Sequence, residues 1–230
     1  GKHQLLKILE RLGCGSLDNL AIHGINRPEH LDWALHGGGN DLLEWAQGEG
    51  HATQVGFSSH GSQALIAAAI SSGRFQFCSL HLHLLDPQRL PLAHRALEQG
   101  MGVLAISPAD KGGRLQAPSP TLISDCAPFT PLQLAYRFLL AQGISTLSVG
   151  AAQASDLDLA AALQSSDSPL TLEEQSSLQR LTDHRRERVG ADLCGQCQAC
   201  LPCPNEVPIP ELLRLRNLAI GHDLIPFCQE

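Results

Sequence analysis

Short apolar runs alternate with amphipathic stretches along residues 1–168, and this alternation narrows the possible folds more than any other feature of the chain. The strand-like runs lie at residues 20–23, 54–58, 77–84, 102–107 and 145–150. Strands that alternate with helices build βα units, and successive units make a parallel sheet. The sequence therefore predicts an α/β fold. An open, doubly wound sheet is the competing architecture, but no glycine-rich dinucleotide fingerprint follows the first run.

Cap and stop signals place helices between these runs. Leucines from Leu5 to Leu12 share one helical face, and Gly13 follows them as a C-terminal stop. Thr130 is expected to cap a helix through Gln142 that begins with proline, a residue favoured at the first helical position. Further helices are predicted near residues 41–47, from Ser62 to Gly73, over residues 88–99 and from Ser155 onward, whereas the Pro-, Ser- and Gly-rich residues 108–128 are predicted to form a loop.

The character of the sequence changes after Pro169. Thr171 and Glu174 form a capping box for a helix that runs to about Arg188, and the basic last turn of this helix suits its dipole. A cysteine-rich segment follows, and Pro210 then opens a final short helix. We therefore divide the chain into a βα portion at residues 1–168, a connector helix at 169–190 and a cysteine-rich segment at 191–230.

Four of the eight cysteines lie within ten residues. Cys194, Cys197, Cys200 and Cys203 form three consecutive C-x-x-C steps, and Pro204 follows the last one. A tight loop of this kind wraps thiolates around one cubic cluster, and a cysteine before proline supplies a further ligand. Soft thiolates select iron–sulfur clusters or zinc. The spacing therefore predicts a 4Fe–4S cluster.

Two points stay open for this segment. A zinc site usually presents two C-x-x-C pairs separated by a longer loop, and three steps without a gap fit that pattern poorly. The last step is also shorter by one residue than in the bacterial ferredoxin run, so either Cys203 or Cys228 supplies the fourth cluster ligand. The lone cysteines Cys14, Cys78 and Cys126 are expected to be buried small residues.

Charge and composition exclude several classes of partner. The formal net charge is −7, and an acidic chain lacks the basic surface that binds nucleic-acid phosphates. No apolar run is long enough to span a membrane, and no signal peptide is visible. Clustered cysteines in a chain of 230 residues indicate a metal or cluster site in a reducing compartment rather than a disulfide scaffold. We therefore expect a cytoplasmic protein.

Four segments together resemble a known family: Leu20–Asn26, Val55–Gly61, Gly102–Gly112 and Cys194–Pro210. The chain is similar to the aldo/keto reductase family, in the branch with a C-terminal ferredoxin-like 4Fe–4S segment. Members are (β/α)8 TIM barrels that transfer a hydride between a nicotinamide cofactor and a carbonyl or alcohol. The resemblance implies a partial TIM barrel, with strands 4 to 8 in residues 1–168 and a helical iron–sulfur segment at 191–230.

The resemblance also implies a set of cofactor-binding residues. Ser58 matches a residue that holds the nicotinamide carboxamide, while Ser59 and Ser79 stand where many members have Asn and Gln. Ser107 and Lys111 follow the run that matches the seventh strand, where the loop of the family covers the cofactor pyrophosphate. The implied cofactors are NAD(P)H and the 4Fe–4S cluster, with the choice between NADP and NAD left open. The implied partners are a small carbonyl or alcohol substrate and a redox protein.

His23 matches the catalytic histidine of the family at the end of a strand, where an imidazole can hydrogen-bond a substrate carbonyl. The Tyr, Lys and Asp that act with it belong to the first three strands of the family, and the resemblance implies that these strands are missing from this chain. The single tyrosine, Tyr136, falls inside a predicted helix, so we expect it to be a packing residue. Two functions therefore stay open: an oxidoreductase, or a non-enzymatic iron–sulfur electron carrier or interaction protein on a degenerate barrel. We expect a fragment of a longer reductase, rather than a chain completed by a partner or a degenerate paralogue.

Overall fold

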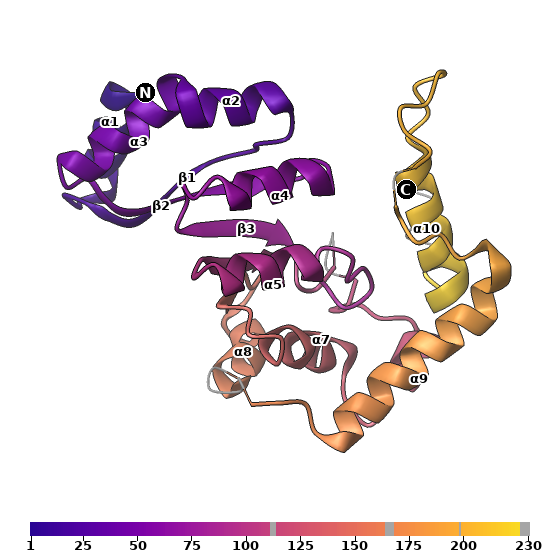
Figure 1. Ribbon diagram of the computed structural model, residues 1–230. Coiled ribbons are helices and arrows are strands. Elements are labelled where there is room, and N and C mark those ends of the chain that lie inside the picture. Colours follow the sequence, from indigo (N-terminus) through magenta and orange to yellow (C-terminus); the bar gives the residue numbers. More distant parts are fainter. Residues whose placement is uncertain (111–113, 164–167, 198, 226–230) are drawn as a thin grey trace. The chain divides into compact units, whose positions relative to one another are not determined.

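A computed structural model describes residues 1–110, 114–163, 168–197 and 199–225 of the chain (Figure 1). The chain divides into two compact units. Unit 1 consists of residues 1–82, 89–106 and 143–148, and unit 2 consists of residues 83–88, 107–142 and 149–230.

Unit 1 contains a parallel sheet of five strands, which lie in the order β1-β2-β3-β4-β5. Each strand pairs in parallel with the next one along the chain, and helices join successive strands. The predicted α/β class is therefore confirmed, and the sheet is that of a partial (β/α) barrel. The strands are β1 (Leu17–Ile22), β2 (Ala52–Ser59), β3 (Phe77–His81), β4 (Gly102–Ile106) and β5 (Thr146–Leu147).

The helices of unit 1 largely follow their predicted caps. Gly13 ends the first helix in the left-handed conformation with φ 67°, and the Ser62 hydroxyl accepts the Leu65 N–H at the start of the fourth. The prediction near residues 41–47 missed a separate helix that begins at Pro28, a favoured first residue. The helices are α1 (Lys2–Leu12), α2 (Pro28–His36), α3 (Gly38–Gly48), α4 (Gln63–Ser71) and α5 (Leu90–Glu98).

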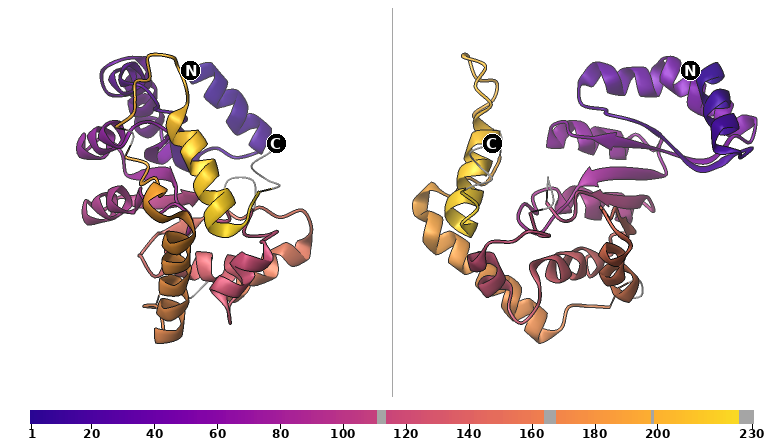
Figure 2. Two further views of the ribbon diagram at one scale, coloured as in Figure 1. Left: turned by 90° about the vertical axis from the view of Figure 1, so that its right-hand side faces the viewer. Right: turned by 180° about the vertical axis from the view of Figure 1, so that it is seen from behind.

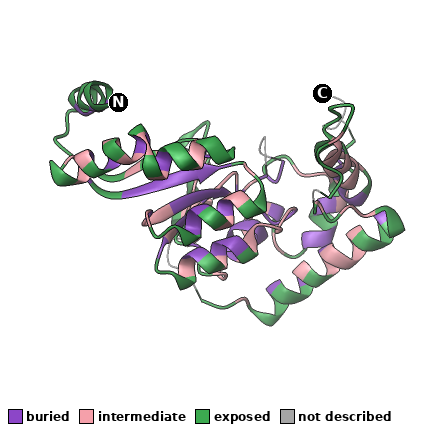
Figure 3. Cartoon of the chain, turned by 45° about the horizontal axis from the view of Figure 1, so that its top comes forward, coloured by how far each residue is buried: buried purple, intermediate pink, exposed green. Residues whose placement is uncertain are grey.

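The middle of the sheet forms the core of unit 1. Val55 and Phe57 of β2 and Leu80 of β3 are fully buried. Gly56 lies between the first two, and a Cβ atom at this position would stand 2.5 Å from the Phe77 carbonyl oxygen of β3. Only glycine fits there because the clash would be with backbone, which cannot turn away. Figure 3 shows buried residues along the sheet and exposed residues on the outer faces of the helices.

Unit 2 is helical, and four of its helices contribute to one apolar cluster. Leu122 from the first helix, Leu181 from the long helix and Leu218 from the last helix are all buried in it. The long helix α9 contacts both α6 and α10 (Figure 2). None of the helices in the described part of the chain is long and apolar enough to cross a membrane. The elements of this unit are α6 (Pro120–Cys126), α7 (Pro131–Leu140), α8 (Asp158–Leu163), α9 (Leu172–Val189), α10 (Ile209–His222) and the 3-10 turns η1 (Ala154–Leu157) and η2 (Gly190–Asp192).

The predicted loop at residues 108–128 is wrong where α6 lies. The Ser119 hydroxyl accepts the Leu122 N–H at 3.1 Å, and Pro120 occupies the first helical position. Leu122 and Cys126 stand four residues apart and are both fully buried, which is the spacing of one helical face. The composition of the segment favours a loop, but this short face is buried in the core of unit 2.

Element lengths also differ from the predictions at three places. The strand predicted at residues 77–84 ends at His81, and Leu84 and Leu85 instead join the apolar cluster of unit 2. The strand predicted at 145–150 is only Thr146–Leu147. The final helix continues to His222, because Leu218 and His222 are buried and hold its second half in place. At Leu82 and Leu84 the apolar pattern indicated burial correctly, but burial does not require strand pairing.

A buried carboxylate at the end of α6 ties this helix to α9. The Arg188 guanidinium donates to both oxygens of Asp125, at 2.6 Å and 3.0 Å, and His184 Nδ1 lies 2.7 Å from Oδ1. Burial alone would raise the pKa of Asp125, but the hydrogen bonds from Arg188 and His184 outweigh it and lower that pKa below its ordinary value. The ionised form therefore stabilises the fold, and this contribution is lost as the pH falls through the lowered pKa.

The substitution Asp125→Asn is expected to lower the free energy of unfolding by about 1–3 kcal/mol, because it replaces charge-assisted hydrogen bonds with neutral ones. The deficit should be full above about pH 5, should begin to shrink near pH 4, where the carboxyl of the unfolded chain protonates, and should vanish below the lowered pKa of the folded protein. Urea unfolding at several pH values measures both effects. Asp183→Asn is the matched control, since this carboxylate is 46% exposed and 3.9 Å from Arg186, and it should cost less than about 0.5 kcal/mol. Equal costs for the two variants would contradict the role given to Asp125.

Candidate functional site

His23 and Ser58 meet where the first two strands end. His23 directly follows β1, and its Nδ1 atom lies 3.1 Å from the Ser58 hydroxyl of β2. The same hydroxyl accepts the Gly24 N–H at 3.0 Å, and the Ile25 N–H donates to the Ser58 carbonyl at 2.9 Å. Parallel strands bring their carboxyl ends to one edge of a sheet, so this contact follows from the topology. Ser58 thereby holds the backbone that carries His23.

Two further predicted residues belong to the same part of unit 1. The Ser59 hydroxyl accepts the Gly61 N–H at 3.0 Å and donates to the Ile25 carbonyl. Ser79 lies opposite Ser58 in the ladder between β2 and β3. The three serines are buried, whereas His23 is exposed. The structure therefore groups His23 with Ser58, Ser59 and Ser79, which the sequence placed in or directly after three predicted strands.

The hydrogen bonds around Ser58 suit a particular tautomer of His23. The Ser58 hydroxyl accepts the Gly24 N–H, and it can then donate its own proton to His23 Nδ1. In this arrangement the proton of a neutral imidazole is on Nε2. An exposed Nε2–H group can donate a hydrogen bond to a carbonyl oxygen.

The remaining predicted cofactor residues lie elsewhere in the chain. Ser107 belongs to unit 2, where it is half-buried and has a φ of 56°. Lys111 lies outside the described residues.

Unit 2 also contains an apolar cavity of about 690 Å³, a volume typical of small-molecule sites. Its walls include Leu115, Ile123, Phe129, Leu132 and Gly150.

The four clustered cysteines lie in a loop between η2 and α10, which we call the cysteine loop (residues 193–208). Cys197 and Cys200 are exposed, Cys194 and Cys203 are half-buried, and all four are free thiols. Within the described ranges, no three Cys, His, Asp or Glu side chains converge as a set of metal ligands. The donor chemistry and the spacing of the loop nevertheless fit an iron–sulfur cluster, because four soft ligands are carried on one short segment. Cys228 lies outside the described residues.

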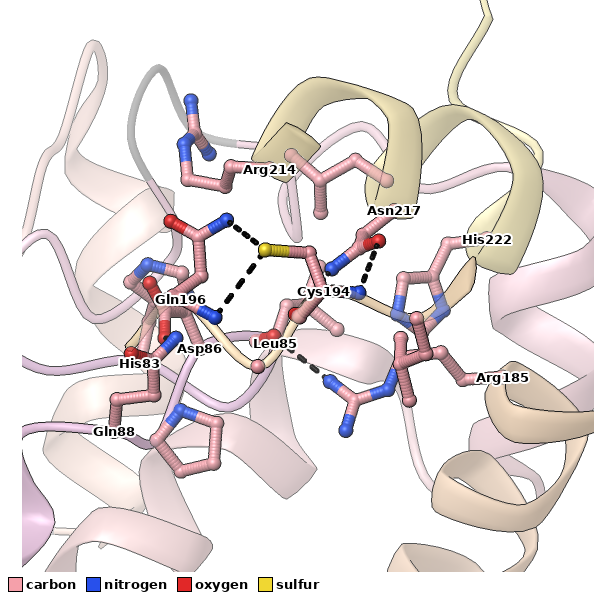
Figure 4. A pocket seen from close by; sticks show the side chains of 14 residues that line it. His83, Leu85, Asp86, Gln88, Arg185, Cys194, Gln196, Arg214, Asn217 and His222 are labelled. Carbon is pink, nitrogen blue, oxygen red and sulfur yellow. Dashed lines mark hydrogen bonds between the residues drawn. The ribbon is translucent and has the colours of Figure 1, made fainter. Parts of the chain in front are cut away.

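Cys194 is the most constrained of these thiols. Its sulfur lines a cavity of about 190 Å³ and accepts hydrogen bonds from the Gln196 backbone N–H (3.4 Å) and Nε2 (3.5 Å) (Figure 4). Asn217 of α10 bonds both the N–H and the carbonyl of Cys194. Cys194, one of the four predicted cluster ligands, is therefore held in place by α10.

The lone cysteines divide into two kinds. Cys78 and Cys126 are fully buried, as predicted, and burial raises the pKa of each thiol to about 12. The prediction is wrong for Cys14, which is exposed. Cys14 follows the glycine that ends α1, and its N–H bonds the Leu9 carbonyl at 3.1 Å, so only its backbone belongs to the helix terminus.

Sequence reasoning missed several residues that shape these sites. Asn217 lies within a helix of ordinary composition, and no local signal marks it as a partner of Cys194. Gln196 stands inside the C-x-x-C spacing, which could have suggested contact with the sulfur. His60, which follows β2, and His81, at the end of β3, have tilted rings whose centroids lie 4.3 Å apart. Only the folded chain brings such pairs together.

No protein-family model matches this chain, and no curated protein matches it. Solved structures do. The aldo-keto reductase AKR11C1 from Bacillus halodurans, in its holo form, aligns with a TM-score of 0.63 at 20% identity, over 78% of this chain and 63% of that one. The glycerol dehydrogenase AKR11B4 from Gluconobacter oxydans aligns with a TM-score of 0.59 at 15% identity, over 80% and 64%. The aldose reductase from Schistosoma japonicum aligns with a TM-score of 0.54 at 20% identity, over 77% and 62%. This chain thus spans less than two thirds of each structure, and it shares the fold of part of the aldo-keto reductase barrel.

The structure predicts a sharp difference in thiol reactivity. In the native, metal-free protein, iodoacetamide should alkylate Cys197, Cys200 and Cys14, while Cys78 and Cys126 should react at least about a hundredfold more slowly. The cause is the small thiolate fraction of a buried thiol together with its lack of access. Mass spectrometry of timed samples measures each rate, and unfolding in urea should remove the difference. Rapid native labelling of Cys78 or Cys126 would contradict their burial.

Proposed function

We propose that this chain is part of an aldo/keto reductase-type oxidoreductase whose C-terminal segment binds a 4Fe–4S cluster. The reaction is hydride transfer between a nicotinamide cofactor and a small carbonyl or alcohol substrate. One observation carries the proposal: a sheet with the fold of part of the aldo-keto reductase barrel precedes, in one chain, a loop of four free thiols in three C-x-x-C steps. The chain covers 63% of the first of those structures, so the activity is proposed for the whole protein.

His23 is the residue proposed to contact the substrate. Its Nδ1 atom is engaged by Ser58, which orients the ring, and its exposed side chain can direct Nε2–H to a carbonyl oxygen. A hydrogen bond to this oxygen polarises the carbonyl and favours negative charge on the oxygen as hydride is added to carbon. The alternative is a surface histidine that is merely held by a serine, and activity measurements separate the two roles.

The nicotinamide cofactor supplies or accepts the hydride when it is bound. Ser58, Ser59 and Ser79 are proposed to hold its carboxamide end, and Ser107 and Lys111 are proposed to hold its phosphates. The Ser58 proton goes to His23 and the Ser59 proton to the Ile25 carbonyl, so these two hydroxyls would accept from the carboxamide N–H groups. The lysine charge complements phosphate.

Cys194, Cys197, Cys200 and Cys203 are proposed as the four cluster ligands. All four lie on the cysteine loop, and Cys203 is preferred to Cys228 because it continues the regular spacing of the other three. The cluster would relay electrons or brace the C-terminal segment. Thiolate ligation needs a reducing compartment, so we propose the cytoplasm as the site of function.

A second candidate function is a non-enzymatic iron–sulfur protein. One observation favours it for this chain alone: Tyr136, its single tyrosine, is 2% exposed within α7 and so is a packing residue, as predicted. It cannot act as a strand-end proton donor. Under this alternative the cysteine loop would carry electrons or bind a partner, and the barrel portion would be only a platform.

Anaerobic purification should yield roughly four iron and four acid-labile sulfide per chain, with broad brown absorbance, because a cubic cluster takes four cysteine ligands. Iron and sulfide analysis with a visible spectrum measures this. Cys197→Ser should abolish most of the absorbance, while Cys14→Ser, a change at an exposed cysteine outside the loop, should leave it unchanged. One zinc and no sulfide would overturn the cluster.

The chain should bind NADPH, and Ser58→Ala should weaken this binding by about three- to tenfold, since one hydrogen bond to the carboxamide and the support of His23 are lost. Isothermal titration calorimetry measures the affinity. Ser16→Ala is the matched control, because Ser16 is exposed just before β1, and it should bind as the wild type does. If the wild-type chain shows no saturable binding, the non-enzymatic alternative is supported.

A further inference from the structure

Cys194, the first cysteine of the cysteine loop, is hydrogen-bonded through both its backbone N–H and its carbonyl to a side chain of α10. Asn217 donates from Nδ2 to the Cys194 carbonyl at 2.8 Å and accepts the Cys194 N–H on Oδ1 at 3.3 Å. The two residues lie 23 positions apart, so the contact is tertiary. The next residue, Leu218, is 3% exposed in the apolar cluster of unit 2 and anchors this turn of the helix. The direction of the Cys194 side chain is therefore tied to a packed helix.

Gln196 directs two N–H groups at the sulfur of the same cysteine. Its backbone nitrogen lies 3.4 Å and its Nε2 atom 3.5 Å from Cys194 Sγ (Figure 4). Nε2 also donates to the Pro210 carbonyl in the first turn of α10, at 2.8 Å. The backbone of Gln196 has a φ of 54°, which is uncommon for any residue other than glycine. The loop is thus closed onto both the first turn and the middle of α10.

These contacts have a direct electrostatic consequence. N–H groups that point at sulfur stabilise negative charge on it, and hydrogen bonds to ligand sulfurs are one of the factors that set the reduction potential of a cluster. Removing such a donor disfavours the reduced, more negative cluster more than the oxidised one. Groups that orient a ligand also govern affinity, with losses of about 10- to 100-fold when they are replaced.

We propose that Asn217 and Gln196 are positioning residues that hold Cys194 as the preformed first ligand of the cluster site, and that the Gln196 side chain raises the reduction potential of the cluster. This inference rests on the proposed cluster. It gives the cysteines different roles in cluster binding. Cys194 is held in place before the cluster binds, whereas the exposed Cys197 and Cys200 close around the metal. Neither Asn217 nor Gln196 is itself a ligand.

The test compares three variants of the full chain, loaded anaerobically with iron and sulfide. Asn217→Leu removes both bonds to the Cys194 backbone at similar volume, and Gln196→Met removes the side-chain donor at similar length. Asn205→Leu changes an exposed residue of the same loop and is the control. The measurements are the rate of cluster loss to a chelator, followed by visible absorbance, and the midpoint potential from a redox titration.

Asn217→Leu should lose the cluster about 10- to 100-fold faster than the wild type. Gln196→Met should keep the iron content but show a lower midpoint potential, which a purely structural role would not produce. Asn205→Leu should match the wild type in both. A second measurement needs no cluster: hydrogen–deuterium exchange of the Cys194 amide in the metal-free protein should be slow in the wild type and fast in Asn217→Leu.

The outcomes separate the two proposals. If the wild type takes up no iron and sulfide, the proposed cluster fails, whatever the amide exchange shows. If the wild type loads normally but Asn217→Leu and Gln196→Met match it in cluster loss and potential, the proposed function stands and the positioning roles are overturned. Loss of the helical circular dichroism signal in Asn217→Leu would leave Gln196→Met, a change in the loop, to decide the question.

Discussion

Parallel strand pairing is the constraint on which the candidate catalytic region depends. A parallel ladder cannot be closed by a tight turn, so each strand of unit 1 is followed by a helical connection and the next strand enters from the same end. The carboxyl ends of neighbouring strands consequently meet at one edge. This is why His23, which follows β1, touches Ser58 near the end of β2, a residue 35 positions away. The close approach of β2 and β3 at Gly56 keeps the neighbouring serines in register.

Unit 2 depends on a different interaction, the packing of helices around one apolar cluster with buried ion pairs at its margin. Asp125 joins α6 to α9 through Arg188, and Arg137 of α7 pairs with Glu174 in the first turn of α9 at 2.7 Å. Buried charges are tolerated only when they are paired and hydrogen-bonded, and each of these carboxylates has both kinds of partner. The long helix α9 is thereby held by charge as well as by apolar contact, and α10 packs against it closely enough that Gly221 has no room for a Cβ beside Arg185.

The two ends of the cysteine loop are held by the packed helices of unit 2. It begins just after α9 and η2 and ends at α10, so its two ends are carried by packed elements while its middle is exposed. The same burial that keeps Cys78 and Cys126 protonated is absent from Cys197 and Cys200. Thiols of two functional kinds therefore coexist in one chain, and the difference between them is their access to solvent. The proposed ligand set has one fixed and two exposed members, and such a set combines pre-organisation with a route for metal entry.

The sequence by itself determined the α/β class, most strand and helix positions, the packing role of Tyr136 and the chemical character of the cysteine loop. These features depend on local information: hydrophobic periodicity, caps such as Ser62 and Thr171, and spacing between cysteines. Tertiary structure alone decided that residues 120–126 form a helix, that Cys14 is exposed and that β3 ends at His81. It alone also paired Asn217 with Cys194 and Asp125 with Arg188. The physical reason is that burial and hydrogen bonding between distant residues depend on which surfaces come together in the folded chain. A local sequence pattern contains no information about which distant surfaces those are.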